Sequence, residues 1–173
     1  MNARTRTIEG AGGDTVHETV WGSPIGPLTI RGTDKVLTEI VLPRDKRPAG
    51  RRRPGRPTAA AVETALAQLE EYFAGTRTEF DLPLALAGTP FQVDVWQTLA
   101  DIPYGATVSY GELAAMVGRP TAFRAVGQAN GANPIPIVLP CHRVLAAGGR
   151  IGGYGGGLPI KRQLLALEGV AVD

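Results

Sequence analysis

The chain has 173 residues, of which 43% are hydrophobic and 20% are charged, and its formal net charge is +2. These values argue against disorder outside short segments and allow one ordinary globular domain or two small ones. No stretch approaches the roughly 20 apolar residues of a membrane-spanning helix, and the N-terminus lacks the apolar run of a signal peptide. We therefore expect a soluble, cytoplasmic protein without a membrane partner.

The first half of the chain carries strand signals followed by one helix signal. Residues 17–32 and 35–43 alternate apolar and polar side chains between turn-forming clusters, which predicts two or three antiparallel strands. Residues 57–75 have apolar side chains at helical spacing and end in Gly75, and residues 78–84 could form an edge strand. This pattern predicts a small α/β (α+β) domain over residues 1–88.

A basic segment interrupts this half. Residues 44–56, RDKRPAGRRRPGR, hold seven Lys or Arg and one Asp, so the basicity of the chain is local. Arginines separated by Pro and Gly cannot build a core, which predicts a solvated loop over residues 44–57. Two interpretations stay open: a mobile connector, or an arm that binds phosphates without sequence preference.

Helix-start signals become dense from residue 89, where we expect a mainly helical C-terminal domain, 89–173. Thr89 and Ser109 each begin a capping-box pattern, and the second helix should end at Gly118. A short turn and a third helical pattern over residues 122–131 then complete a helix-turn-helix candidate. The third helix carries Arg124 among small residues, which suits either tight helix packing or DNA contact.

The only cysteine, Cys141, lies in the segment NPIPIVLPCHRVL, residues 133–145. Its three prolines predict a stiff, extended segment. Free cysteines are often simply buried, but the neighbouring His142 and Arg143 could both favour a thiolate. Successive side chains of an extended segment point in opposite directions, so Cys141 and His142 need a local bend or a bridging water to act together.

The remaining motifs exclude two common kinds of cofactor site. The glycine-rich residues 148–157 contain no G-x-G-x-x-G register, and Lys161 lacks the preceding glycine of a P-loop. The glycines instead suit the approach of a flat ligand, with Tyr154 as the bulky group. With two histidines and one cysteine in the chain, we predict no metal and no cofactor. The last helix should run from Pro159 to Gly169.

Glu168 lies in the final turn of that helix, where the helix dipole disfavours an anion. The residue four positions before it is Leu164, so no cation compensates it locally. We expect this carboxylate to be either solvated or directed at a partner such as a histidine.

Three segments together resemble the O6-alkylguanine-DNA alkyltransferase family, in its bacterial Ogt-like branch: SYGELA, FRAVGQANGANPIPIVLPCHRV and GGYGGGLPIKRQLLALEG. The resemblance is close from Phe91 to Gly169 and looser in the N-terminal half. It implies a DNA-repair enzyme that irreversibly transfers the alkyl group of O6-alkylguanine, and of O4-alkylthymine, in duplex DNA to its own cysteine. It also implies nucleotide flipping from the minor groove by a monomer, with cooperative binding along DNA left open.

The resemblance assigns roles to the residues that match the family pattern. Cys141 resembles the acceptor thiolate, His142 the base that activates it through a water, and Glu168 the carboxylate that orients the histidine. Asn133 matches a hinge asparagine. Tyr110 matches a tyrosine that protonates guanine as the alkyl group leaves.

Other matching positions imply contacts with DNA. Arg124 resembles the arginine that fills the place of the flipped base, Tyr154 walls the base pocket, and the backbone near Val144 and Gly155 reads the guanine. Further DNA contacts are expected at Ser109, Ala125, Gly127 and Gln128. The chain departs from the family pattern at three positions: a small residue is expected at Phe123, a glycine or apolar residue is common at Gln128, and some relatives carry serine at Gly155.

Four other functions can be compared with this interpretation. Alkyltransferase-like proteins bind and flip alkylated guanine without repairing it, but they replace the cysteine that this chain retains. A bifunctional relative would need a metal-thiolate domain, which a single cysteine excludes on this chain. A cysteine hydrolase would need an oxyanion hole, for which no motif is present. A plain DNA-binding module predicts that Cys141→Ala changes nothing.

Overall fold

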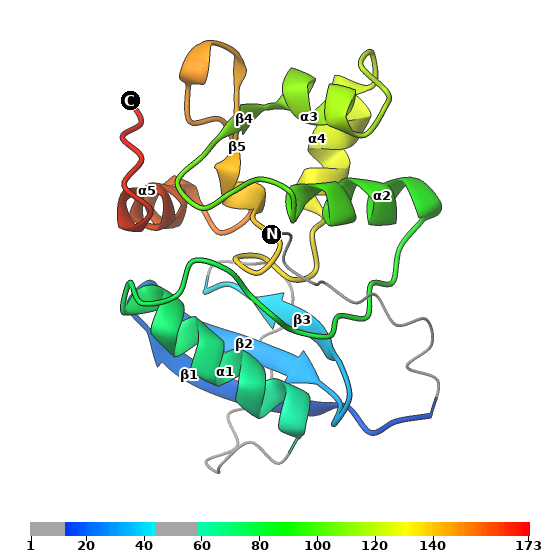
Figure 1. Cartoon of the computed structure of the whole chain (residues 1–173), viewed down its shortest axis with the longest axis vertical. Helices are drawn as coiled ribbons and strands as arrows, with labels where there is room; N and C mark the ends of the chain where they lie inside the picture. The colour runs from blue at the N-terminus through cyan, green and yellow to red at the C-terminus, as the bar shows by residue number, and fades with distance from the viewer. Residues whose placement is uncertain (1–12, 44–58) are drawn as a thin grey trace. The chain divides into compact units, whose positions relative to one another are not determined.

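The computed structural model describes residues 13–43 and 59–173. The chain divides into two compact units, Met1–Leu86 and Ala87–Asp173, each with its own secondary structure (Figure 1). The predicted basic loop, 44–57, lies outside the described residues, so both of its interpretations stay predictions. No helix in the described ranges is long and apolar enough to cross a membrane.

The N-terminal unit is an antiparallel sheet with one helix across it (Figure 1). Its strands β1 (His17–Ser23), β2 (Gly26–Gly32) and β3 (Leu37–Val41) lie in the order β1-β2-β3. Helix α1 (Ala60–Phe73) packs on the sheet and buries Val62 and Leu69, which the apolar spacing predicts. The helix stops before Gly75, whose φ of 75° is the left-handed conformation that glycine favours.

The prediction of an edge strand over residues 78–84 is wrong except at one position. Leu84 forms an isolated bridge with Leu37 of β3, through hydrogen bonds from Leu37 N to Pro83 O and from Ala85 N to Leu37 O, and residues 78–82 are not in a strand. The side-chain amide of Gln68 on α1 instead accepts a hydrogen bond from Asp81 N and donates one to Asp81 O, both at 2.9 Å. A side chain therefore satisfies the backbone groups that a neighbouring strand would otherwise pair with.

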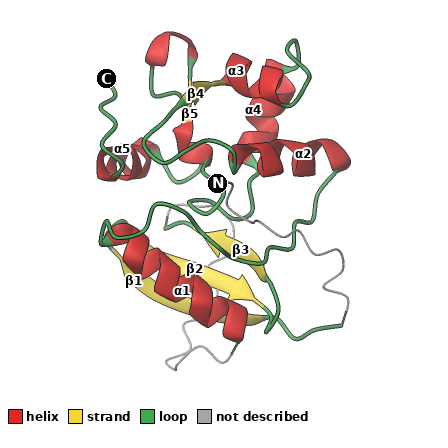
Figure 2. Cartoon of the chain, viewed as in Figure 1, coloured by secondary structure: helices red, strands yellow, loops and turns green. Residues whose placement is uncertain are grey.

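The C-terminal unit is mainly helical, as predicted (Figure 2). Its elements in chain order are α2 (Pro90–Leu99), β4 (Val108–Ser109), α3 (Tyr110–Met116), α4 (Phe123–Gly131), η1 (Cys141–Arg143), β5 (Val144–Leu145), η2 (Ala147–Gly149) and α5 (Leu158–Leu167). Both predicted capping boxes form, with Thr89 before α2 and Ser109 before α3. The short strands β4 and β5 pair in parallel and bring the start of α3 beside the residues that follow Cys141.

Helices α3 and α4 form the predicted helix-turn-helix and pack on α2. Val126 and Ala129 of α4 are buried, and Trp96 of α2 donates a 2.8 Å hydrogen bond to Ala129 O. Arg124, Ala125 and Gln128 lie on the exposed part of α4. The helix therefore uses one side for packing and keeps a small-residue side with a single arginine in solvent.

Candidate active site around Cys141

The segment before Cys141 folds back on itself, so the prediction of an extended segment is wrong. Leu139 N donates to Ile135 O at 3.0 Å, and Pro136 and Leu139 form an isolated bridge. Asn133 closes this turn: its Oδ1 accepts from Ile135 N at 2.9 Å and its Nδ2 donates to Leu139 O at 2.7 Å. The prolines restrict φ, but the asparagine side chain decides the direction of the chain.

A positive φ shows how tightly this turn is held. Ile137 has φ of 74°, which is unfavourable for a β-branched residue and persists only where the surroundings enforce it. Ile137 is fully buried, and the paired backbone on either side of it provides that constraint. The turn is thus a rigid support for the cysteine that follows.

Cys141 opens the 3₁₀ turn η1, so the chain bends at Cys141 and His142 and does not continue as an extended segment. The thiol is buried, with 5% of the residue exposed. Burial raises the pKa of Cys141, whereas hydrogen bonds with Asn133 and Tyr154 and the positive charge of Lys161 act in the opposite direction. The three groups favour the thiolate, whereas burial favours the neutral thiol.

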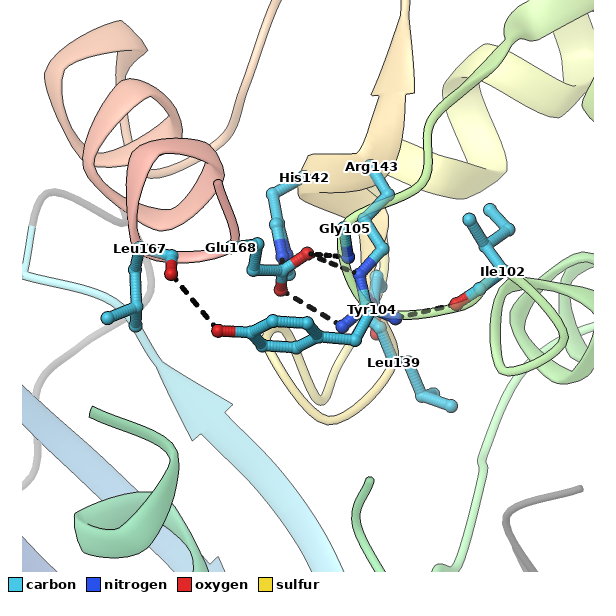
Figure 3. Close-up of polar contacts among 9 residues, drawn as sticks. Ile102, Tyr104, Gly105, Leu139, His142, Arg143, Leu167 and Glu168 are labelled. Atoms are coloured by element: carbon cyan, nitrogen blue, oxygen red, sulfur yellow. Dashed lines mark hydrogen bonds and ion pairs between the residues drawn. The ribbon is translucent and has the colours of Figure 1, made fainter. Parts of the chain in front are cut away.

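His142 is fully buried and contacts Glu168 (Figure 3). Its Nε2 lies 2.7 Å from Glu168 Oε1, and its Nδ1 has no hydrogen-bond partner within the described part of the chain. Burial lowers the pKa of His142, although the contact with Glu168 raises it. A neutral ring that donates Nε2–H to the carboxylate has a lone pair on Nδ1, so Nδ1 can accept a proton.

Glu168, which caps the end of α5, is held by several donors rather than solvated. Arg143 donates to both of its oxygens, with Nε at 2.8 Å from Oε2 and Nη2 at 2.9 Å from Oε1, and Gly105 N donates at 3.2 Å (Figure 3). Burial alone would raise the pKa of Glu168, but the hydrogen bonds from His142 and Arg143 hold it far below its usual range. The carboxylate is therefore ionised. The expected histidine partner is present, and Arg143 is a second partner that sequence reasoning missed.

Arg143 and Tyr104 complete this cluster. Arg143 Nη1 donates to Ile102 O at 2.6 Å, and its guanidinium lies 5.8 Å from the centroid of the Tyr104 ring. Tyr104 donates from its hydroxyl to Leu167 O at 3.0 Å, at the end of α5 (Figure 3). The loop after α2 thus fixes the position of Glu168. No local signal in the sequence marks Tyr104 for this position.

Lys161 is another residue that sequence reasoning missed, because it was considered only as a P-loop lysine. It is fully buried, and its Nζ donates to Ile151 O at 2.6 Å, Val144 O at 2.7 Å and Gly153 O at 3.1 Å. Burial lowers its pKa to about 8, opposed by the charge of Cys141. Lys161 lies three and four residues before the buried Leu164 and Leu165. This helical spacing is the sequence signal that places it on the inner side of α5.

Tyr110 begins α3 and lies close to both Cys141 and α4. Burial and the charge of Cys141 raise the pKa of its hydroxyl, and a hydrogen bond with Asn130 opposes this shift. A Cβ added to Gly127 would lie 3.6 Å from its ring, as would one added to Gly152. Gly127, which has no side chain, thus lets α4 approach Tyr110 closely.

The other predicted contact residues differ in exposure. Ser109 caps α3, Val144 is buried in β5, Tyr154 is half-buried beside the thiol, and Gly155 is exposed. Arg124 is exposed at the start of α4, remote in sequence from the buried cluster. In the described residues, no group of three His, Cys, Asp or Glu side chains could hold a metal ion.

Two family models match the chain over nearly its whole described length. The ribonuclease-like domain of 6-O-methylguanine DNA methyltransferase matches residues 16–86, and the DNA binding domain of 6-O-methylguanine DNA methyltransferase matches residues 90–170. The chain belongs to the 6-O-methylguanine DNA methyltransferase family. The resemblance that the sequence motifs indicated is confirmed, and the cluster around Cys141 lies wholly within the match to the family's DNA-binding domain.

Similar methyltransferases of this family include bacterial and archaeal proteins. The Mycobacterium tuberculosis (strain H37Rv) protein named methylated-DNA--protein-cysteine methyltransferase is 51% identical over 154 residues, which cover 88% of this chain and 92% of the relative. A Methanosarcina acetivorans protein of the same name is 44% identical, over 89% of this chain and 99% of the relative. The crystal structure of Mycobacterium tuberculosis OGT in complex with DNA matches with a TM-score of 0.79 and 50% identity, over 87% of this chain and 91% of that one. The predicted fold class is therefore confirmed for both units.

Proposed function

We propose that this protein repairs DNA by direct reversal, in a single transfer of the alkyl group of O6-alkylguanine to Cys141. The observation that carries this function is the buried thiol itself, which lies beside Asn133, Tyr154 and Lys161 and next to a histidine paired with an ionised carboxylate. Relatives that are about half identical are named methylated-DNA--protein-cysteine methyltransferase, and a similar structure is a complex with DNA.

The chemistry balances without a cofactor. The thiolate of Cys141 attacks the alkyl carbon, so that an S–C bond forms as the C–O6 bond breaks and its electron pair leaves with guanine. The proton of the thiol goes to Nδ1 of His142, directly or through a water, and Tyr110 donates a proton to the departing guanine anion. The products are an S-alkylcysteine and an unmodified guanine, and no step regenerates the thiol.

Glu168 holds His142 in the required tautomer. An ionised carboxylate accepts Nε2–H and leaves Nδ1 as the acceptor, which is the role that the sequence resemblance implies for this pair. Arg143 already compensates the charge of Glu168 and itself lowers the pKa of His142. Both effects favour the neutral imidazole before it accepts the proton. The ionised Glu168 then stabilises the imidazolium that forms.

The exposed side of α4 suits the approach to DNA. The buried thiol of Cys141 cannot reach the alkyl carbon of a base that is stacked in the duplex, so the nucleotide must rotate out at a cost of a few kcal/mol. We assign to Arg124 the filling of the vacated place in the stack. Ala125, Gly127 and Gln128, with Ser109 at the start of α3, would contact the adjacent backbone. Tyr154, Val144 and Gly155 would then line the pocket of the flipped base.

Further details extend this proposal. We propose that O4-alkylthymine is a second substrate, that the protein acts as a monomer with binding along DNA that could be cooperative, and that it works in the cytoplasm. A binding-only role of the alkyltransferase-like kind is not favoured, since the acceptor cysteine is present.

The deciding experiment uses duplex DNA that contains O6-methylguanine labelled in its methyl group. The label should reach the protein in at most one equivalent per chain and should map to Cys141. The Cys141→Ala variant should bind the same duplex without acquiring label. Repeated turnover, or transfer that survives in Cys141→Ala, would contradict the proposed function.

A further inference from the structure

Phe123 is a bulky apolar residue that is exposed to solvent. It is the first residue of α4 and is 49% exposed. The described residues include three other exposed large hydrophobic side chains, Val16, Met116 and Leu158. Phe123 alone among these adjoins Arg124, at a position where the family pattern has a small residue. The exposed ring of Phe123 therefore lies next to the arginine that the proposed function directs toward DNA.

The contacts of Phe123 associate it with Arg124. The guanidinium of Arg124 lies 5.9 Å from the centroid of the Phe123 ring, within the range of a cation–π interaction. Ala122, the residue that caps α4, provides no side-chain hydrogen bond to the first turn. The start of the helix therefore presents an aromatic ring, a guanidinium and uncapped backbone N–H groups, which together suit a polyanion with exposed bases.

The helical spacing also directs Phe123 toward the reactive side of α4. Gly127 lies four residues later, one helical turn away on the same side, and Gly127 lies against the ring of Tyr110. Phe123 thus continues the surface that leads from Arg124 toward Tyr110. Val126, Ala129 and Asn130 are the buried residues of α4, whereas Phe123 is about half exposed.

We propose that Phe123 is a second inserting side chain, which stacks on a base beside the gap that Arg124 fills. This inference rests on the proposed function. The extrusion of a nucleotide opens a gap between two base faces. A guanidinium is smaller than the base that it replaces, so it leaves part of both faces uncovered. Phenylalanine is one of the apolar wedges that minor-groove proteins insert between bases, and it stacks on any base because every base has a π-face. Such a wedge suits repair at any sequence.

The test compares Phe123→Ala with Met116→Ala, since Met116 is a similarly exposed apolar residue, 45% exposed, at the end of α3. Two substrates are used: duplex DNA with O6-methylguanine, and free O6-benzylguanine, which needs no insertion. Phe123→Ala should slow transfer from the duplex about tenfold, the loss expected from one stacked base. It should leave the reaction with the free base unchanged, and Met116→Ala should match the unmodified protein on both substrates.

A spectroscopic readout keeps this inference separate from the transfer reaction. 2-Aminopurine placed next to the lesion fluoresces when it is unstacked and is quenched when an aromatic ring covers it. Binding of the unmodified protein should give a quenched signal and Phe123→Ala a bright one, with Phe123→Trp restoring the quenching. This signal reports stacking even if no methyl group is transferred, so its failure is distinguishable from failure of the proposed function.

The inference is overturned if Phe123→Ala reacts with the duplex at the rate of the unmodified protein. It is overturned equally if the variant loses as much rate with free O6-benzylguanine, or if its 2-aminopurine fluorescence is unchanged. A variant that altered only the dependence of DNA binding on protein concentration would also overturn it, because Phe123 would then contact a neighbouring protein molecule.

Discussion

Arg143 donates two hydrogen bonds to Glu168, of 2.8 and 2.9 Å, and the side chains of both residues are buried. The carboxylate that contacts His142 therefore has a permanent counter-charge. The arginine directly follows the histidine in the chain, so a single 3₁₀ turn delivers both donors to one acceptor. The orientation of His142 and the charge state of Glu168 consequently depend on the same short segment as Cys141.

Removal of Arg143 should destabilise the protein strongly. In Arg143→Met, Glu168 stays buried with only part of its hydrogen bonding, and breaking a buried pair in this way typically costs about 3–5 kcal/mol. Denaturant titration at neutral pH should show this loss in the free energy of unfolding. The exposed Arg150→Met is the matched control and should change it by less than about 0.5 kcal/mol. A loss of similar size in both variants would refute a special role for the pair.

Glu168 should also make stability depend on acidity. Its pKa is depressed in the folded protein, so between the folded pKa and the ordinary value of about 4.3 the unfolded chain binds more protons. The stabilisation is thus complete above about pH 5 and is lost as the pH falls. Denaturant titrations at a series of pH values should show a shallower acid dependence in Glu168→Gln than in the unmodified protein. The exposed Glu63→Gln should keep the original slope, and identical slopes in all three proteins would contradict the assignment.

Lys161 should control the reactivity of Cys141. Its positive charge favours the thiolate, so Lys161→Met should raise the pKa of Cys141 further. The rate of alkylation by iodoacetamide, followed as a function of pH, measures this pKa directly. Arg162→Met, which removes an exposed cation from the next position on α5, should leave the profile in place. A thiol pKa that is the same in both variants would show that Lys161 acts only as a clamp on the backbone of residues 144–153.

The hydroxyl of Tyr110 should matter for transfer more than for binding. Burial keeps it protonated near neutral pH, and Tyr110→Phe retains the ring that packs against α4. The rate of methyl transfer from duplex DNA should fall about 100-fold, the usual scale of general acid catalysis. Affinity for the same duplex, measured in a Cys141→Ala background, should change little. A parallel loss of rate and affinity would indicate a positioning role instead.

The helices of this protein could be predicted from the sequence because the signals that start and stop them are local. The capping boxes at Thr89 and Ser109, and the glycines that follow α1, α3 and α5, act within one turn of the residues they affect. The two wrong predictions concern segments whose backbone groups bond to amide side chains, which the spacing of apolar residues and prolines does not reveal. Gln68 holds residues near Asp81, and Asn133 closes the turn before Cys141.

The motif around Cys141, together with Tyr110 and Glu168, was enough to indicate the family and its chemistry, because a reactive residue type can be recognised wherever it stands. The charges around that motif were decided only when the chain folded. Lys161 and Tyr104 reach the cluster from α5 and from the loop after α2, and Glu168 acquires Arg143 as well as His142. A pKa depends on burial and on charges within a few ångströms, and these are properties of tertiary contacts, so no linear pattern contains them.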